Sequence, residues 1–156
     1  SLQPAVGYNW GARKFSRVRA IERCCFLASA IISVLSALAL FAAPEQITRL
    51  FVPSPDPELL ALAVTALQLF SITYLTRWFS FATQRYMLAV EKPLPATVIS
   101  VSTALIFPVI LIGIFWPLGL TGLWLNMAGT SVLAALMSAV ILKKLRPELH
   151  QPDPAV

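Results

Sequence analysis

The chain has 156 residues, of which 58% are hydrophobic and only 12% are charged, about half the charged fraction of an ordinary soluble domain. With a mean hydropathy of +0.77, this composition excludes a soluble globular domain, a disordered segment and a disulfide-stabilised secreted domain. It favours a protein whose main partner is the lipid bilayer. The net charge of +5 does not indicate nucleic acid as a partner, because the basic residues lie between long apolar runs.

Cysteine and histidine usage gives no sign of a metal site. The two cysteines, Cys24 and Cys25, are adjacent, and neither fits the spacing of metal ligands. The single histidine, His150, lies in a polar segment near the C-terminal end. We therefore expect no metal and no cofactor.

Four apolar segments follow a basic N-terminal segment. A helix of about twenty residues rises about 30 Å, which is the thickness of the hydrocarbon core of a bilayer. The first connection contains Pro53, Pro55 and Pro57, which cannot continue a helix, and Pro108 is expected to kink the third segment. The sequence therefore predicts an all-α integral membrane protein with four transmembrane helices, at about residues 24–43, 59–90, 96–116 and 123–142.

The basic residues predict which side of the membrane each connection faces. The N-terminal segment, the connection with Lys92 and the segment after residue 142 are basic, whereas the other two connections hold only Arg49. Basic connections stay in the cytoplasm, so both ends of the chain are expected there, with residues 149–156 as a polar cytoplasmic tail. Residues 13–23 are expected to form a basic surface helix on the anionic cytoplasmic leaflet.

The first residues carry a specific motif. Residues 3–12 read Q-P-A-V-G-Y-N-W-G-A and resemble the Q-P-x-x-G-Y-N-x-G-A signature of the multidrug and toxic compound extrusion (MATE) family of antiporters. In that family the motif lies at the cytoplasmic end of the eighth helix, and its two glycines here are expected to allow a close backbone approach or a positive φ. The signature residues in this chain are Gln3, Pro4, Gly7, Tyr8, Asn9 and Gly11.

Later segments resemble the same family in the same order. Residues 41–47 look like its F-x-x-P-E-x-I helix end, and residues 56–63 look like the acidic start of its tenth helix. Residues 89–93 read A-V-E-K-P where family members often have A-x-G-K-P, so Glu91 stands in place of a glycine. Residues 119–125 look like the G-L-x-G-V-W-L run that opens the twelfth helix.

This resemblance implies that the chain is a fragment of a longer antiporter. Family members have twelve helices in two six-helix lobes around a central cleft. Residues 1–148 would be the C-terminal part of the second lobe, from the end of helix eight through helix twelve. The partners would then be the missing first lobe and the rest of the second lobe. The implied function is efflux of organic cations, drugs or other amphipathic small molecules across the inner membrane, by Na⁺- or H⁺-coupled antiport with alternating access.

Candidate site residues lie on the second and fourth apolar segments. All acidic residues stand at segment ends or in connections, so the site of the coupling Na⁺ or H⁺ is expected outside this fragment. Residues 59–90 form the most polar of the four helices, and Tyr74 and Gln84 on it are candidates for contact with substrate. Asn126 is a further cleft candidate, in a polar patch whose neighbouring small residues suit close helix packing.

Arg77 allows two interpretations. In a long helix it would lie about 20 Å from the cytoplasmic end, and a charge at that depth normally faces a cavity or a partner. If the hydrocarbon region instead ends near Thr76, Arg77 and Trp78 would lie together at the cytoplasmic interface.

Three alternatives to drug efflux differ in what they require. A flippase for lipid-linked sugars, within the same superfamily, would need a wide basic cleft, and Arg77 and Arg85 leave this possibility open. A non-transporting membrane scaffold would need only four apolar helices. A membrane enzyme would need reactive groups facing a cavity, and because the four segments contain no His, Asp or Glu, we expect that the protein is not an enzyme.

Overall fold

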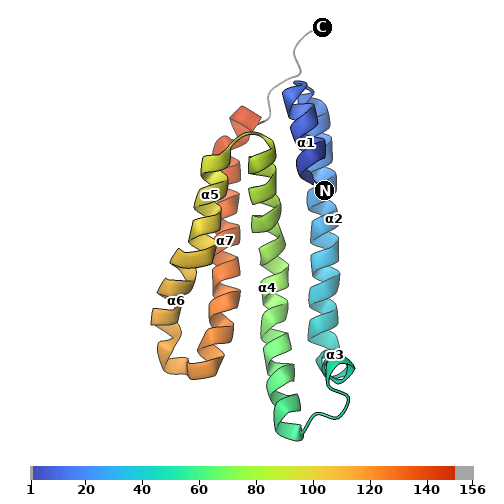
Figure 1. Ribbon diagram of the computed structural model, residues 1–156, viewed down its shortest axis with the longest axis vertical. Helices are drawn as coiled ribbons and strands as arrows, with labels where there is room; N and C mark the ends of the chain where they lie inside the picture. Colours follow the sequence, from blue (N-terminus) through green and yellow to red (C-terminus); the bar gives the residue numbers. More distant parts are fainter. Residues whose placement is uncertain (1, 150–156) are drawn as a thin grey trace.

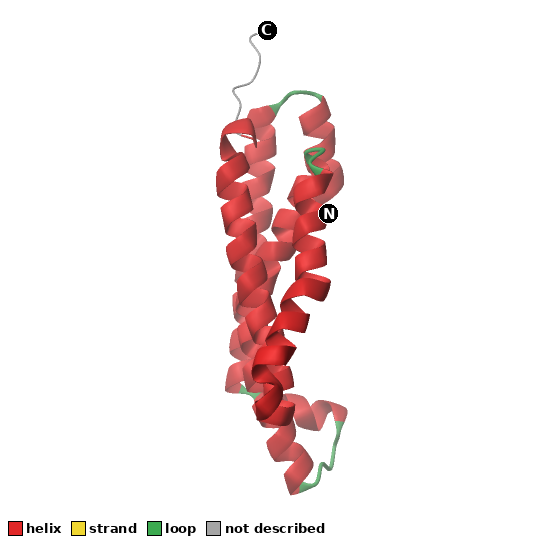
Figure 2. Cartoon of the chain, turned by 90° about the vertical axis from the view of Figure 1, so that its left-hand side faces the viewer, coloured by secondary structure: helices red, strands yellow, loops and turns green. Residues whose placement is uncertain are grey.

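The computed structural model describes residues 2–149 and is helical over nearly all of them. The longer helices share one long axis, whereas a short helix, α3, lies across it (Figures 1 and 2). In chain order the elements are α1 (Leu2–Gly11), α2 (Phe15–Ala42), α3 (Pro44–Phe51), α4 (Pro57–Ala89), α5 (Pro93–Val101), a π-helical turn η1 (Ser102–Ile106), α6 (Phe107–Phe115), a 3₁₀ turn η2 (Trp116–Leu118) and α7 (Gly119–Leu149).

Three segments are long and apolar enough to cross a membrane: Phe15–Ala42, Pro57–Ala89 and Pro93–Leu149. The last has 57 residues and doubles back at η2, so that α6 packs beside α7 (Figure 1). All four ranges expected to span the membrane are therefore helical over most of their length. The count of four spans stays a prediction, as does the twelve-helix architecture.

The expectation of a separate basic surface helix over residues 13–23 is wrong. The basic residues from Arg17 to Arg23 lie in the first turns of α2, which continues without a break into the apolar segment. Val18 is fully buried, and the partly buried Ile21 packs against the same core cluster. The helix is continuous because these apolar residues pack against α1 and α4, and because no proline or glycine interrupts the sequence.

The first connection contains a helix that we did not predict. Pro44 begins α3, with Glu45 in its first turn and Arg49 in its last turn, as the helix dipole favours. The three prolines that follow occupy the loop and the start of α4. The backbone N–H of Leu59 donates a 2.7 Å hydrogen bond to the Asp56 side chain, which caps α4.

The third apolar segment is distorted before its proline. Pro108 has no N–H to donate, and the turn ahead of it, η1, is π-helical, which is one of the usual causes of a bend in a helix. Figure 1 shows the change of direction between α5 and α6. The expected kink is therefore present, and it coincides with the π-helical turn η1.

The hairpin between α6 and α7 depends on two glycines. Gly119 has a φ of +56°, a conformation that glycine adopts without strain. A Cβ atom on Gly122 would collide with the carbonyl oxygen of Phe115. The two helices can therefore approach closely only with glycine at this position.

The buried core lies at one end of the bundle, where α1 and the ends of α2, α4, α5 and α7 meet (Figure 1). The basic N-terminal segment, the α4–α5 turn and the end of α7 share this end, as the topology prediction requires. Leu149, expected in the polar tail, is instead the fully buried last residue of α7. The rest of that tail, residues 150–156, lies outside the described residues.

Candidate functional site

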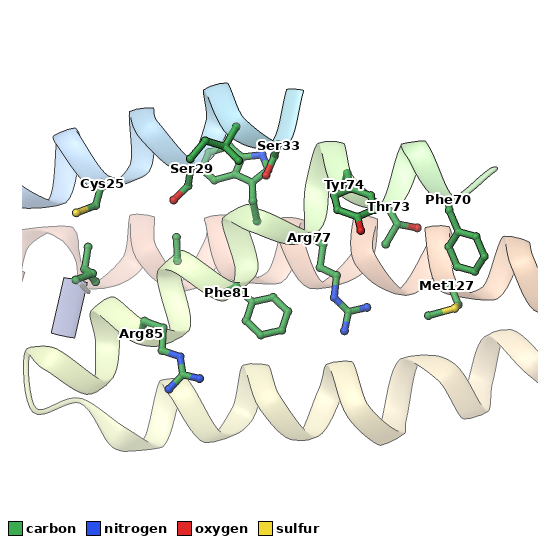
Figure 3. A pocket seen from close by; sticks show the side chains of 14 residues that line it. Cys25, Ser29, Ser33, Phe70, Thr73, Tyr74, Arg77, Phe81, Arg85 and Met127 are labelled. Carbon is green, nitrogen blue, oxygen red and sulfur yellow. The ribbon is translucent and has the colours of Figure 1, made fainter. Parts of the chain in front are cut away.

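A cavity of about 730 Å³ lies between α2 and α4, within the range that holds a drug-sized ligand. Figure 3 shows its side chains from close by. The lining includes Cys25, Ser29 and Ser33 of α2, Phe70, Thr73, Tyr74, Arg77, Trp78, Phe81 and Arg85 of α4, and single residues of α1 and α7, Leu2 and Met127.

Helical spacing places the cavity residues of α4 on one face. Phe70, Tyr74, Arg77, Phe81 and Arg85 follow one another at intervals of three or four residues, so their side chains form a stripe along the helix. In Figure 3 the side chains of Arg77, Phe81 and Arg85 extend from α4 toward α5, on the side of α4 away from Ser29 and Ser33 of α2. The face therefore combines aromatic rings with two guanidinium groups.

Arg77 contacts an aromatic ring in place of a carboxylate. Its Cζ atom lies 5.3 Å from the centroid of the Phe81 ring, which is a cation–π distance. Within residues 2–149, neither Arg77 nor Arg85 forms an ion pair with an acidic side chain. The cavity is lined by two positive charges and by no acidic residue.

The contacts of Phe26 fix the register between α2 and α4. Its ring centroid lies 5.8 Å from that of Phe79 and 6.4 Å from that of Tyr86, so Phe26 is level with the part of α4 between them. Because the helices run in opposite directions, Arg77 is then level with residues near Ile32, which also lines the cavity. Arg77 lies about 13 Å along the axis from Arg23, beside the uncharged part of α2.

The four predicted site residues do not all meet. Tyr74 and Arg77 line the large cavity together. Gln84 lines a smaller cavity of about 170 Å³ that also touches Arg77, and its Nε2 donates to the carbonyl oxygen of Ala96 on α5 at 3.4 Å. Asn126 is buried in α7, where its Oδ1 accepts a 3.2 Å hydrogen bond from Thr130. Asn126 does not line the large cavity.

The signature residues form α1, which packs against α2 and α4. A Cβ on Gly7 would lie 3.6 Å from the carbonyl oxygen of Ala89, so this glycine lies close to the end of α4. Of the two roles expected for the signature glycines, Gly7 shows the close backbone approach. The positive φ lies two residues after Gly11, at Arg13, whose φ is +55°. Asn9 donates a 2.8 Å hydrogen bond to the carbonyl oxygen of Ala5, within the helix.

The remaining signature side chains are not buried: Gln3 is half-buried, and Pro4 and Tyr8 are exposed.

Sequence reasoning missed part of the cavity wall. Cys25, Ser29 and Ser33 stand four residues apart on α2, and this spacing was the available signal for a polar stripe. Thr73 belongs to the polar residues that the sequence places on α4, but its sequence position does not distinguish it from the others. Its buried hydroxyl has no hydrogen-bond partner within the described part of the chain. Glu22, expected at the edge of a span, is a buried carboxylate near the hydroxyl of Tyr86, although the two groups do not meet hydrogen-bond geometry.

Comparison with known proteins agrees with the resemblance seen in the sequence. No curated protein matches the chain. A sequence model of the family described as MatE matches residues 1–114, which is well over half of the 156 residues and runs from α1 nearly to the end of α6. The chain therefore belongs to the MatE family of membrane transporters.

Proposed function

We propose that this chain supplies part of the substrate cleft of a secondary active exporter. The exporter moves organic cations, drugs or other amphipathic compounds outward in exchange for Na⁺ or H⁺. The observation that carries this proposal is the cavity of about 730 Å³ between two apolar helices, which is lined by aromatic and polar side chains. Residues 1–148 would provide the end of helix eight and helices nine to twelve of a twelve-helix protein.

The exposed surface of α2 supports the need for a further lobe. Large apolar side chains along it are exposed, among them Leu27, Ile31, Leu35 and Leu38. Such a surface requires either lipid or other helices as its surroundings. In alternating access, two lobes rock about a site between them, so the first lobe and the rest of the second lobe would close the open side of the cavity.

The coupling ion would bind outside this fragment. A coupling site needs a group whose protonation or occupancy biases two conformations. The lining of the large cavity contains no carboxylate, and the buried Glu22 lies apart from it among the residues at the basic end. We therefore place the Na⁺ or H⁺ site in the parts of the protein that this chain lacks.

A flippase for lipid-linked sugars is the second candidate function. Arg77 and Arg85 on the cavity favour it, because guanidinium groups pair well with phosphates. Lipid-linked sugars would then have to be turned over between leaflets by the full protein, whereas soluble amphipathic compounds would not be moved.

Transport by the full native protein in proteoliposomes tests the proposal. The substrates are a panel of fluorescent amphipathic compounds of both charges, and a Na⁺ or H⁺ gradient is imposed across the membrane. We expect transport of at least one compound that stops when an ionophore collapses the gradient. If no compound moves faster than in empty liposomes while a lipid-linked sugar is turned over, the flippase function replaces efflux.

A further inference from the structure

We propose that the cavity between α2 and α4 selects amphipathic ligands whose polar group is an anion, a carboxylate or a phosphate, attached to an aromatic or apolar body. This inference rests on the proposed function and narrows it, because that function includes organic cations as well as other amphipathic compounds. It assigns that charge from the side chains that line the cavity.

The positive charge of the cavity is concentrated on one face of α4. Arg77 and Arg85 are eight residues apart on the same stripe, so their Cα atoms are separated by about 12 Å along the helix. An organic cation in this cavity would be repelled by both guanidinium groups. An anionic group would be attracted by both, and it can accept two hydrogen bonds from a single guanidinium.

Arg77 has only part of the compensation that its position requires. A guanidinium has five N–H donors, which normally bond to water. The part of α2 beside Arg77 is uncharged, so it offers this guanidinium no charged partner. The Phe81 ring faces the charge at 5.3 Å but accepts no conventional hydrogen bond. Within the described residues no carboxylate pairs with this guanidinium, so an anionic ligand would supply the missing acceptor.

A second, independent observation is the hydroxyl of Thr73. This side chain is only 5% exposed and lines the cavity, yet its oxygen has no hydrogen-bond partner within residues 2–149. A buried hydroxyl without a partner is costly. Tyr74, next in the chain, adds a phenolic hydroxyl on the same cavity (Figure 3). Both hydroxyls can donate to an anion.

The apolar part of the ligand would lie against aromatic rings. Phe70, Trp78 and Phe81 line the same cavity, and flat apolar bodies pack well against such rings. The volume of about 730 Å³ is enough for one molecule of drug size. The cavity thus combines a cationic stripe with an aromatic wall.

Cys25 gives a direct measurement of the charge preference, because it lines the cavity beside Ser29. In the full native protein with every other cysteine replaced, including Cys24→Ala, the rates of two methanethiosulfonate reagents are compared. One reagent is anionic (sulfonatoethyl) and the other is cationic (trimethylammonioethyl). Relative to a free thiol in solution, we expect the anionic reagent to be favoured by at least about tenfold, as a cleft of one charge sign favours its counter-ion.

Substitutions assign this preference to the arginines. Arg77→Gln and Arg85→Gln should each lower the ratio of the two rates several-fold, whereas Arg77→Lys, which keeps the charge, should restore it. Arg49→Gln removes the same charge from α3, outside the cavity, and should leave the ratio unchanged. A preference for the cationic reagent, or a ratio that no arginine substitution changes, overturns the proposal.

Protection of Cys25 from the neutral reagent N-ethylmaleimide tests the ligand class and its source. Carboxyfluorescein and rhodamine 123 share a ring system but carry opposite charges. Protection by carboxyfluorescein supports a soluble anionic ligand. Protection in liposomes that contain phosphatidylglycerol, compared with phosphatidylcholine alone, supports a lipid phosphate as the anion. Protection by rhodamine 123 alone, or by neither dye nor lipid, overturns the proposal.

The failure of this inference can be distinguished from the failure of the proposed function. Gradient-driven transport without any charge preference at Cys25 would retain the exporter and reject the anionic ligand. A charge preference at Cys25 without transport would retain the anion site and reject the exporter.

Discussion

The hydroxyl of Thr76 on α4 donates a 2.8 Å hydrogen bond to the hydroxyl of Ser131 on α7. Ser131 is 1% exposed, and Ala134 and Ser138 on the same face of α7 are fully buried. Small residues let two helix backbones approach closely, so α7 holds one side of α4 while another side faces the cavity. Ser131 is packed, as was expected for this patch of α7. The expected stripe of small residues through Ala135 and Ala139 is wrong, because Ala134 and Ser138 are the buried residues and Ala139 is exposed.

Enlarging a small residue in this interface should separate α4 from α7. Ala134 is fully buried, so Ala134→Leu places a larger side chain in a closely packed position. Overpacking of this kind lowers the free energy of unfolding by about 1–3 kcal/mol. Denaturant unfolding of the full native protein in mixed micelles measures the change in the free energy of unfolding. The control is Ala139→Leu, an exposed position on the same helix, which should cost much less. Equal losses in the two variants would contradict the packing described.

Substitution of Gly122 should disrupt the α6–α7 hairpin. Gly122→Ala brings a Cβ into collision with backbone atoms of Phe115, and because backbone cannot rotate away, we expect a loss of about 2 kcal/mol or more. Thermal unfolding in detergent reports the change. Gly113→Ala is the matched control, since no atom lies within 4 Å of its added Cβ. It should be neutral or stabilising by about 0.5–1 kcal/mol, as alanine favours helix.

Replacing Glu91 by glycine should raise the stability of the protein. Its φ is +58°, in the left-handed region that costs a residue with a side chain about 1–2 kcal/mol. Glu91→Gly should therefore raise the thermal unfolding temperature, while Glu91→Ala, which removes the charge but keeps the Cβ, should not. If alanine stabilises as much as glycine does, charge and not backbone conformation is the cause.

The ion pair between Lys92 and Glu148 should contribute little. Their charged atoms lie 2.6 Å apart and join the α4–α5 turn to the end of α7, but the two side chains are 37% and 55% exposed. Exposed pairs contribute about 0–1 kcal/mol and are screened by salt. A double-mutant cycle with Lys92→Met and Glu148→Gln should give a coupling energy in this range that falls at high salt. A larger coupling that salt leaves unchanged would contradict this assignment.

The apolar segments and the family could be predicted from the sequence alone. Runs such as residues 24–43 are helical because nothing in them breaks a helix, and the signature at residues 3–12 pointed to the family that the sequence comparison now confirms. α3 was not predicted, because half of its eight residues are polar and it lies just before a proline-rich loop. The start of α2 at Phe15 was missed, because the basic residues around Val18 indicate an exposed segment although Val18 itself is buried.

The wall of the cavity could not be predicted, because each long helix is apolar on nearly all sides. The face of α4 that lines the cavity depends on how α2 and α7 pack against it, and such contacts are distant in sequence. The position of Arg77 is an example. Both interpretations of it fitted the sequence, and only the contacts of Phe26 with Phe79 and Tyr86 place it beside uncharged residues of α2.

The most direct test of the central claim is gradient-driven transport by the full native protein with and without Arg77. Proteoliposomes carrying the wild type, Arg77→Gln and Arg49→Gln are compared under one Na⁺ or H⁺ gradient. Initial rates are measured over a range of concentrations of a transported compound. The account predicts transport by the wild type and by Arg49→Gln, and a concentration for half-maximal rate that rises about tenfold in Arg77→Gln, as expected when a charged hydrogen bond is lost. Transport that is identical in all three proteins would contradict the assignment of the α2–α4 cavity as the substrate site.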